Sequence, residues 1–243
     1  MNNKTPAVLA ILVINAVLFL LTQAVPAMKL RDSFALFFWE NPMFGIWQYL
    51  TSMFMHADFT HILFNMMGVL MFGTALERLW GSKKFLILYF AAGLGAGLIQ
   101  NFVNWYQFQG IEAQLLDAGN SRAAIETMLT TGAYNPNTVN VSKDLLQQFW
   151  MLFSIPMVGA SGALYGVLVA YALIYPNNKL MLLFLPFPIA AKFFIPAVLL
   201  LDLFSGVTGF SLFGRNIAHF AHLGGALIGF LLMMYWRHLQ PRN

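Results

Sequence analysis

Three sets of polar side chains interrupt apolar stretches of this sequence, and together they could carry out acyl transfer. Ser161 lies in the Gly-Ala-Ser-Gly run of residues 159–162, His222 lies in a second apolar stretch, and His61 and Asn65 lie in a third. Polar groups are costly inside a membrane and tend to mark function there. Acyl transfer needs a nucleophile, a base and donors to an oxyanion, and these residue types supply all three.

Each set taken alone also has a plainer interpretation. His61 and Asn65 are four residues apart, so on a helix they share one face and could form a packing pair. Gly159 and Gly162, on either side of the serine, could serve close helix packing, or they could open a helix whose first N–H groups bind an anion. His222 could be a satisfied core histidine or a metal ligand.

Glycines spaced four residues apart connect the serine and the histidine. Gly162 and Gly166 form one small-xxx-small face, and Gly225 and Gly229 form another. Such faces let two helix backbones approach closely. Each begins within one turn of Ser161 or of the histidine, so helix packing there could bring the two side chains within the roughly 2.6–3.2 Å that activation of a nucleophile requires.

The composition places these residues in a membrane protein. The chain is 59% hydrophobic and 9% charged, with a mean hydropathy of +0.69. A bilayer span needs about 20 predominantly apolar residues, and six stretches qualify: 7–25, 60–78, 85–104, 149–175, 180–205 and 217–236. We therefore expect an all-α polytopic membrane protein, a six-transmembrane-helix bundle that forms a single domain over residues 1–243.

Two long external loops are expected, at residues 26–59 and 105–148. The first is rich in Phe, Trp and Tyr, which favours a loop in the headgroup layer, packed on the bundle, or both. The second is expected to contain two short helical pieces at 111–118 and 122–129.

The charges indicate topology, not nucleic-acid binding, although the net charge is +4. With six spans both termini lie on one side, together with most of the basic residues: Lys4, Arg78, Lys83, Lys84, Lys179, Arg237 and Arg242. The positive-inside rule then places both termini in the cytoplasm. Cysteine is absent, which excludes disulfides, a thiol nucleophile and cysteine-based metal or iron–sulfur sites.

Taken together, the motifs resemble those of the rhomboid intramembrane serine proteases, in the six-helix form typical of bacteria. The three family signatures occur in order over nearly the whole chain, as His61-xxx-Asn65, Gly159-x-Ser161-Gly162 and Ala221-His222-xx-Gly225. The resemblance implies that Ser161 is the nucleophile and His222 the general base. It also implies that His61, Asn65 and the backbone N–H of Ser161 bind the oxyanion.

The resemblance extends to supporting residues and has two departures. Tyr165 matches the aromatic residue that packs against the catalytic histidine, His56 matches a histidine before the second helix, and residues 77–78 match the acidic-basic end of that helix. The family commonly has Trp-Arg in the first loop where this chain has Gln48 after tryptophan, and the 105–148 segment is longer than its counterpart in bacterial members.

The function implied is hydrolysis of peptide bonds in or near the transmembrane helices of single-pass membrane proteins, without cofactor or metal. The resemblance places the protein in a bacterial inner membrane, with an active site that opens to the external, periplasmic side. A Ser–His dyad is expected, because no carboxylate is placed in the sequence to orient His222. Asp202, in the fifth span, is expected to make a helix-end or interhelical hydrogen bond.

Two other classes are weighed against this one. A metal-dependent membrane protein could use His56, His61, His219 and His222, but there is no His-Glu-xx-His motif, and no acidic residue lies close in sequence to His219 and His222. A proteolytically inactive relative that binds membrane proteins usually lacks the serine or the histidine, and both are present. The natural substrate and the oligomeric state cannot be deduced from these residues.

Overall fold

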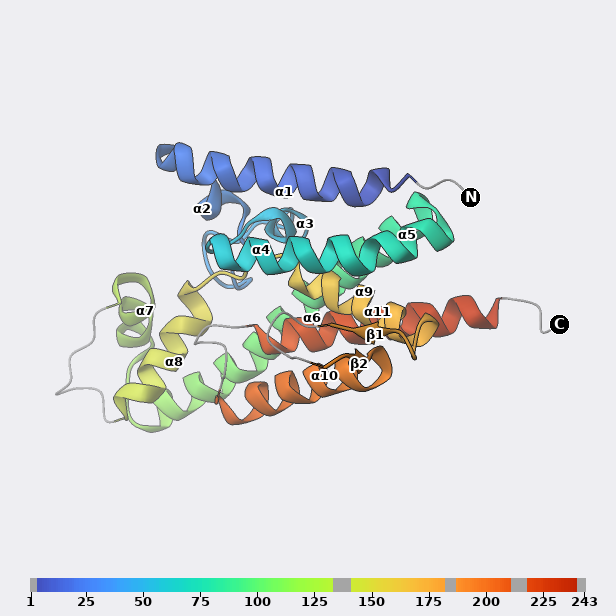
Figure 1. The fold of residues 1–243 in the computed structure, drawn as a ribbon. Helices are drawn as coiled ribbons and strands as arrows, with labels where there is room; N and C mark the ends of the chain where they lie inside the picture. The colour runs from blue at the N-terminus through green and yellow to red at the C-terminus, as the bar shows by residue number, and fades with distance from the viewer. Residues whose placement is uncertain (1–3, 133–140, 182–186, 211–217, 240–243) are drawn as a thin grey trace.

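The computed structural model describes residues 4–132, 141–181, 187–210 and 218–239, and it is a bundle of helices (Figure 1). Within these ranges the only strands are the two-residue β1 (Lys179–Leu180) and β2 (Ile189–Ala190), which pair antiparallel with Lys179 opposite Ala190. The prediction of an all-α protein is confirmed.

Five helical segments are long and apolar enough to cross a bilayer, so the chain is an integral membrane protein. They match five of the six predicted spans: α1 (Pro6–Ala24), the segment Phe59–Trp80, α6 (Ser82–Asp117), α10 (Ala191–Thr208) and α11 (His219–His238). The second of these consists of α4 (Phe59–Gly68), the π-helical turn η3 (Val69–Gly73) and α5 (Thr74–Trp80).

The predicted span 149–175 is wrong, because that stretch is two helices: α8 (Lys143–Ser154) and α9 (Ser161–Ile174). Pro156 and Gly159 lie between them. Proline cannot donate to a helix, and the φ of +121° at Gly159 ends any helical path. At 1.5 Å per residue the 14-residue α9 is about 21 Å long, shorter than the hydrocarbon core of about 30 Å.

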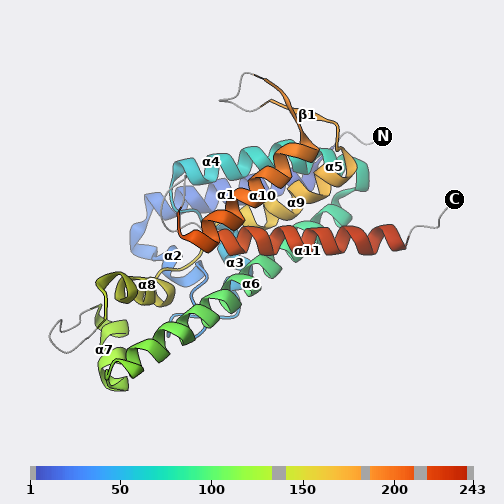
Figure 2. The same ribbon diagram turned by 90° about the horizontal axis from the view of Figure 1, so that it is seen from below.

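The segment after the third span, predicted to be an external loop, also differs from the prediction. The expected helical piece 111–118 is not separate, because its residues continue α6, a 36-residue helix about 54 Å long. The piece at 122–129 is confirmed as α7 (Arg122–Thr131). The end of α6, α7 and α8 share a second apolar core, in which Phe108 stacks on Phe149 at a centroid distance of 4.4 Å. Figure 2 shows these helices at the end of the molecule opposite the termini.

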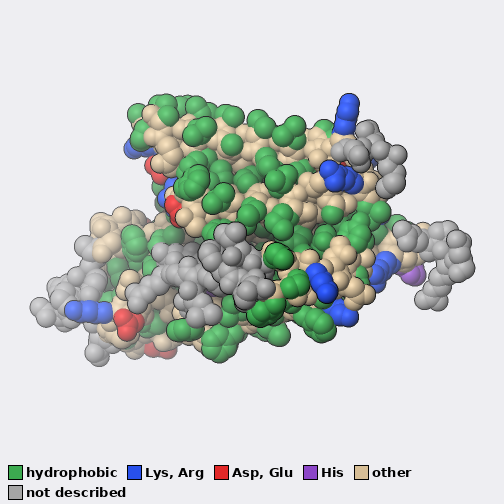
Figure 3. All heavy atoms as spheres, viewed as in Figure 1, with side chains coloured by type: hydrophobic (Ala, Val, Ile, Leu, Met, Phe, Trp, Pro, Cys, Tyr) green, Lys and Arg blue, Asp and Glu red, His purple; other side chains and the backbone are tan. Residues whose placement is uncertain are grey.

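Both described chain ends lie at one end of the bundle, beside the turn between α5 and α6 and the hairpin of β1 and β2 (Figure 1). The Arg237 guanidinium donates to the Leu173 carbonyl there at 3.1 Å, so α9 and α11 end at the same level. Figure 3 shows Lys and Arg side chains at this end and hydrophobic side chains along the outer face of the bundle. Of the predicted basic residues, Arg242 lies outside the described residues.

The helix α9 is packed against α6 and α11 in the interior of the bundle. A β-carbon on Gly225 would lie 1.9 Å from the carbonyl oxygen of Gly162, and one on Gly229 would lie 2.6 Å from the Cα of Gly166. These contacts are between backbones, so only glycine fits. The two small-xxx-small faces meet as the sequence predicts.

The loop between α1 and α4 is packed on the bundle and contains four short helical turns: η1 (Pro26–Met28), α2 (Leu30–Phe34), α3 (Gln48–Thr51) and η2 (Ser52–Phe54). Residues 35–38 are buried, and Leu36 pairs with Met157 through two backbone hydrogen bonds of 2.9 and 2.8 Å. Gln48 is buried and bonds to main-chain groups of three residues between 33 and 43. The glutamine thus holds the loop together, while Trp47 beside it is 57% exposed.

A buried carboxylate fixes the N-terminal end of α1. Glu77 accepts hydrogen bonds from the N–H groups of Ala7 and Val8 at 2.9 and 2.8 Å, and from the Ser82 hydroxyl at 2.6 Å. The first N–H groups of a helix have no partner within the helix. Glu77 satisfies two of them and thereby joins α1 to α5.

Candidate active site

Ser161 is the first residue of α9, where an extended segment enters that helix. The nearby Gly159 has a φ that side-chain-bearing residues rarely adopt and donates its N–H to the Ser52 carbonyl at 2.9 Å. A β-carbon at Gly159 would lie 2.7 Å from Nε2 of His61 and 3.7 Å from Oγ of Ser161. The glycine therefore leaves a small space bounded by the serine hydroxyl and the His61 ring.

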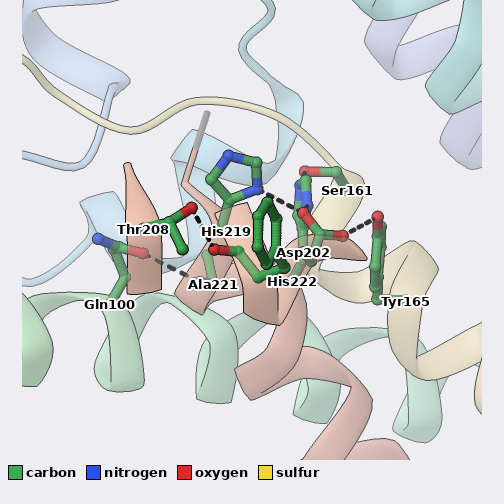
Figure 4. A network of polar contacts seen from close by, with 9 residues as sticks. Gln100, Ser161, Tyr165, Asp202, Thr208, His219, Ala221 and His222 are labelled. Carbon is green, nitrogen blue, oxygen red and sulfur yellow. Dashed lines mark hydrogen bonds and ion pairs between the residues drawn. The ribbon is translucent and has the colours of Figure 1, made fainter. Parts of the chain in front are cut away.

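His222 lies one turn into α11 and contacts the serine directly (Figure 4). Its Nε2 is 2.8 Å from Oγ of Ser161. The Tyr165 ring, one turn after the serine on α9, stacks on the His222 ring with a centroid distance of 4.2 Å and planes 14° apart. The structure thus brings together three residues that the sequence singles out, across the glycine contact between α9 and α11.

A carboxylate lies against the other side of His222, so the expectation that none is placed there is wrong. Oδ1 of Asp202, from α10, is 3.2 Å from Nδ1 of His222 and 2.5 Å from Nδ1 of His219. Its Oδ2 accepts a hydrogen bond from the hydroxyl of Tyr165. The expected interhelical hydrogen bond does exist, and one of its partners is the histidine beside the serine.

These contacts define what each ring nitrogen of His222 can do. A neutral histidine donates through one nitrogen and accepts through the other. An ionised Asp202 only accepts, so Nδ1 of His222 carries the proton toward it. Nε2 is then an acceptor that faces the Ser161 hydroxyl, which is the arrangement a general base requires.

His61 and Asn65 lie on α4, whose first turn is capped by Asp58, which accepts from the His61 N–H at 2.8 Å. The N–H of Ala57 donates to Nδ1 of His61 at 3.4 Å, so Nε2 of the neutral ring carries the proton toward the space beside Gly159. Asn65 is buried and uses one amide N–H on the His61 carbonyl at 2.8 Å. Its second N–H remains to donate.

His56 lies behind His61, with the two rings edge to face at 5.0 Å. Burial, with His61 as a second cause, lowers the pKa of His56 from 6.5 to about 3. His56 is therefore neutral at physiological pH and supports the His61 ring by packing.

Three residues of this site could also hold a metal ion. The ligand atoms of Asp202, His219 and His222 all lie within 4.8 Å of one another, and their types suit Zn²⁺. No acidic residue lies near His219 and His222 along the chain, and Asp202 reaches them from another helix. His56 and His61 are not part of this set.

A cavity of about 180 Å³ opens beside the start of α11. Ala218 lines it together with side-chain amides of α6 and α8: Gln100, Asn101, Asn104 and Gln148. Gln100 Oε1 also accepts the N–H of Ala221 at 2.9 Å, which fixes the first turn of α11 to α6. The cavity therefore offers several amide groups close to the turn that carries His222.

Comparison with known proteins adds a family match. A family model of the rhomboid domain matches residues 44–238. The chain is 27% identical over 242 residues to a mitochondrial presenilin-associated rhomboid-like protein of Rattus norvegicus, covering 96% of this chain and 51% of that protein. It is 24% identical over 192 residues to the rhomboid protease AarA of Providencia stuartii, covering 76% of this chain and 54% of that protein. The chain thus spans about half the length of these relatives.

Proposed function

This chain belongs to the rhomboid family, and from that premise we propose that it is an intramembrane serine endopeptidase. The observation that carries the proposal is the 2.8 Å contact between Nε2 of His222 and Oγ of Ser161. A relative that matches most of this chain is named a rhomboid protease. Others are named rhomboid-like proteins, so proteolysis by this chain needs its own test.

The proposed reaction proceeds through an acyl-enzyme. Oγ of Ser161 attacks the carbonyl carbon of the scissile bond while Nε2 of His222 takes the hydroxyl proton. The tetrahedral intermediate collapses as His222 returns that proton to the leaving amine and the C–N bond breaks. A water molecule, deprotonated by His222, then hydrolyses the ester, which releases the carboxylate product and restores the serine.

The negative oxygen of the intermediate is proposed to lie in the space beside Gly159. Nε2–H of His61 points at this space, and the backbone N–H of Ser161 begins a helix there. Donors aimed at the charge that develops in the transition state are among the largest contributions to enzymatic rate. We assign Asn65 a smaller share, because one of its N–H groups is already used on the His61 carbonyl.

The proposed substrates are single-pass membrane proteins. A protease must bind its substrate as extended backbone, so the substrate helix has to unwind, and small residues, Gly or Pro favour unwinding.

The gathering of Lys and Arg at the end that holds both termini supports a cytoplasmic location for that end. The active site then opens to the opposite, external side. We propose a bacterial inner membrane; the relatives include both mitochondrial and bacterial proteins.

The decisive experiment incubates the purified protein with a model single-pass substrate in detergent or liposomes. Cleavage is expected, and Ser161→Ala, His222→Ala and the double variant should each abolish it to the same extent, because residues that act as one unit are not additive. A matched control is Ser154→Ala at the end of α8, which should cleave at the wild-type rate. Full activity of Ser161→Ala would contradict the assignment of the nucleophile.

The cluster of Asp202, His219 and His222 supports one rival, a metal-dependent hydrolase. A serine enzyme should be labelled at Ser161 by a fluorophosphonate and keep its activity in EDTA. A metalloenzyme should lose activity in EDTA and regain it with Zn²⁺. A protein that neither cleaves nor reacts with the fluorophosphonate would be a non-proteolytic member of the family.

A further inference from the structure

We infer that Asp202 is a positioning residue for His222, so that the site works as a Ser161–His222–Asp202 triad and not as a dyad. This inference rests on the proposed function. Asp202 would hold the His222 ring with its proton on Nδ1 and would stabilise the imidazolium that forms when Nε2 takes the serine proton. It would not touch the substrate.

The contacts of Asp202 are those of a carboxylate held in one orientation. Oδ1 is hydrogen-bonded to Nδ1 of His222 at 3.2 Å and to Nδ1 of His219 at 2.5 Å. Oδ2 accepts a hydrogen bond from the hydroxyl of Tyr165. Three partners from two other helices surround one side chain. Figure 4 shows the carboxylate between them, with Ser161 beyond His222.

The connections of these partners also favour the triad. Tyr165 bonds to Asp202 and stacks on the His222 ring, so it fixes both members relative to each other. His219 lies one turn before His222 on α11 and fixes the carboxylate from the opposite side. A carboxylate meant only to join α10 to α11 could do so through His219 alone.

Burial makes the charge of Asp202 significant. The side chains of Asp202, His219 and His222 are 8%, 11% and 13% exposed. In such surroundings a charge interacts more strongly than in water, and an imidazolium formed without a partner would be strongly disfavoured. When His222 accepts the serine proton, it forms an ion pair with a carboxylate already in contact.

The test compares two carboxylate-to-amide substitutions. Asp202→Asn keeps the size of the side chain but removes its charge, and it should lower kcat by about 10²–10⁴ with KM nearly unchanged, as expected when the tautomer and charge partner of a base are lost. Asp202→Glu should recover part of that loss. Glu77→Gln is the matched control, because Glu77 is also a buried interhelical carboxylate but lies far from the serine in the fold; it should lower the Tm while keeping kcat.

A second readout does not depend on cleavage. In ¹⁵N-histidine NMR spectra the wild-type His222 should be protonated on Nδ1, and Asp202→Asn should shift it toward the Nε2–H form and slow fluorophosphonate labelling of Ser161. If Asp202→Asn lowers the Tm as Glu77→Gln does but keeps kcat, or if wild-type His222 carries its proton on Nε2, the inference is overturned. The wild-type spectrum decides even where Asp202→Asn does not fold.

The two proposals fail in different ways. If the wild-type protein does not cleave and Ser161 does not react with the fluorophosphonate, the proposed function fails. If the wild type cleaves through Ser161 and Asp202→Asn has the same kcat as the wild type, only the assignment of Asp202 as a positioning residue is contradicted.

Discussion

His61 and Asn65 are four residues apart on one helix, yet their side-chain donors have different hydrogen-bonding surroundings. Nε2 of His61 borders the space beside Gly159, whereas Asn65 donates one of its two side-chain N–H groups to the His61 carbonyl. We therefore predict that His61→Ala lowers kcat by about 10²–10³, the typical loss for one oxyanion donor, and that Asn65→Ala lowers it less. KM should change little in both, because these donors act on charge that develops in the transition state.

Steady-state kinetics with a model transmembrane substrate measure both effects, and thermal unfolding serves as the control. Variants that cleave normally but unfold at a lower temperature would show that His61 and Asn65 are a packing pair. The oxyanion would then depend on the backbone N–H groups at the start of α9.

The depressed pKa of His56 gives a prediction about acid stability. Its pKa is about 3 in the folded protein and 6.5 when exposed, so between these values the unfolded chain binds more protons. Stability should fall as pH drops from about 6.5 toward 3, by up to about 1.4 kcal/mol per pH unit. His56→Phe should reduce this slope. Equal slopes in thermal unfolding of His56→Phe and the wild type would refute the assignment.

At the residue level the sequence indicated that Ser161 and His222 lie together, but it did not indicate that Asp202 contacts the histidine. Ser161 and His222 stood out because each is a polar side chain in an apolar stretch, with a glycine face beside it. Asp202 carried only one signal, an acid within a span. Its partners are 17 and 20 residues away on another helix, and no helical spacing rule links residues on two different helices.

At the level of elements, the contact between α9 and α11 supports a test of packing against catalysis. Gly225→Ala would place a β-carbon 1.9 Å from the carbonyl oxygen of Gly162, so the helices must separate. We predict a destabilisation of about 1–3 kcal/mol, the usual range for overpacking, and a loss of cleavage because His222 moves away from Ser161. Thermal unfolding and substrate cleavage measure the two effects.

Gly110 provides the matched control for this substitution. It lies in α6, and a β-carbon there meets nothing within 4 Å. Gly110→Ala should be neutral or slightly stabilising, since alanine favours a helix. If Gly225→Ala is as stable and as active as Gly110→Ala, the close approach of α9 and α11 does not set the geometry of the site.

Helices that cross the membrane were predictable, and helix ends near the site were not. Apolar length identified α1, α6, α10 and α11, since each span must satisfy its own backbone hydrogen bonds in lipid. Residues 149–175 contain no charged residue and are mostly apolar, so hydropathy did not reveal the break at Pro156 and Gly159. The full length of α6 was not predicted either. Polar residues follow position 104, so the predicted span ended there, but the helix continues to Asp117.

For the whole molecule, hydropathy predicted the class of an all-α membrane protein, but not its second apolar core. The helices α7 and α8 bury their own apolar core against the end of α6. Their faces are short, and the sequence between them gives no long-range signal of the packing. The resemblance of the three motifs to one family, confirmed by the domain match over residues 44–238, was more informative about the whole than any single stretch.

The short central helix determines how deep the chemistry takes place. α9 and α11 end level with each other, and from that level α9 rises about 21 Å through a hydrocarbon layer of about 30 Å. Taking the ends of α9 and α11 as one edge of that layer, Ser161 lies roughly 9 Å beneath the opposite edge. The length of α9 therefore sets the depth of Ser161, because each residue added to the start of the helix would move the serine toward that edge by about 1.5 Å. Six more would bring the hydroxyl to the surface, where any soluble peptide could reach it.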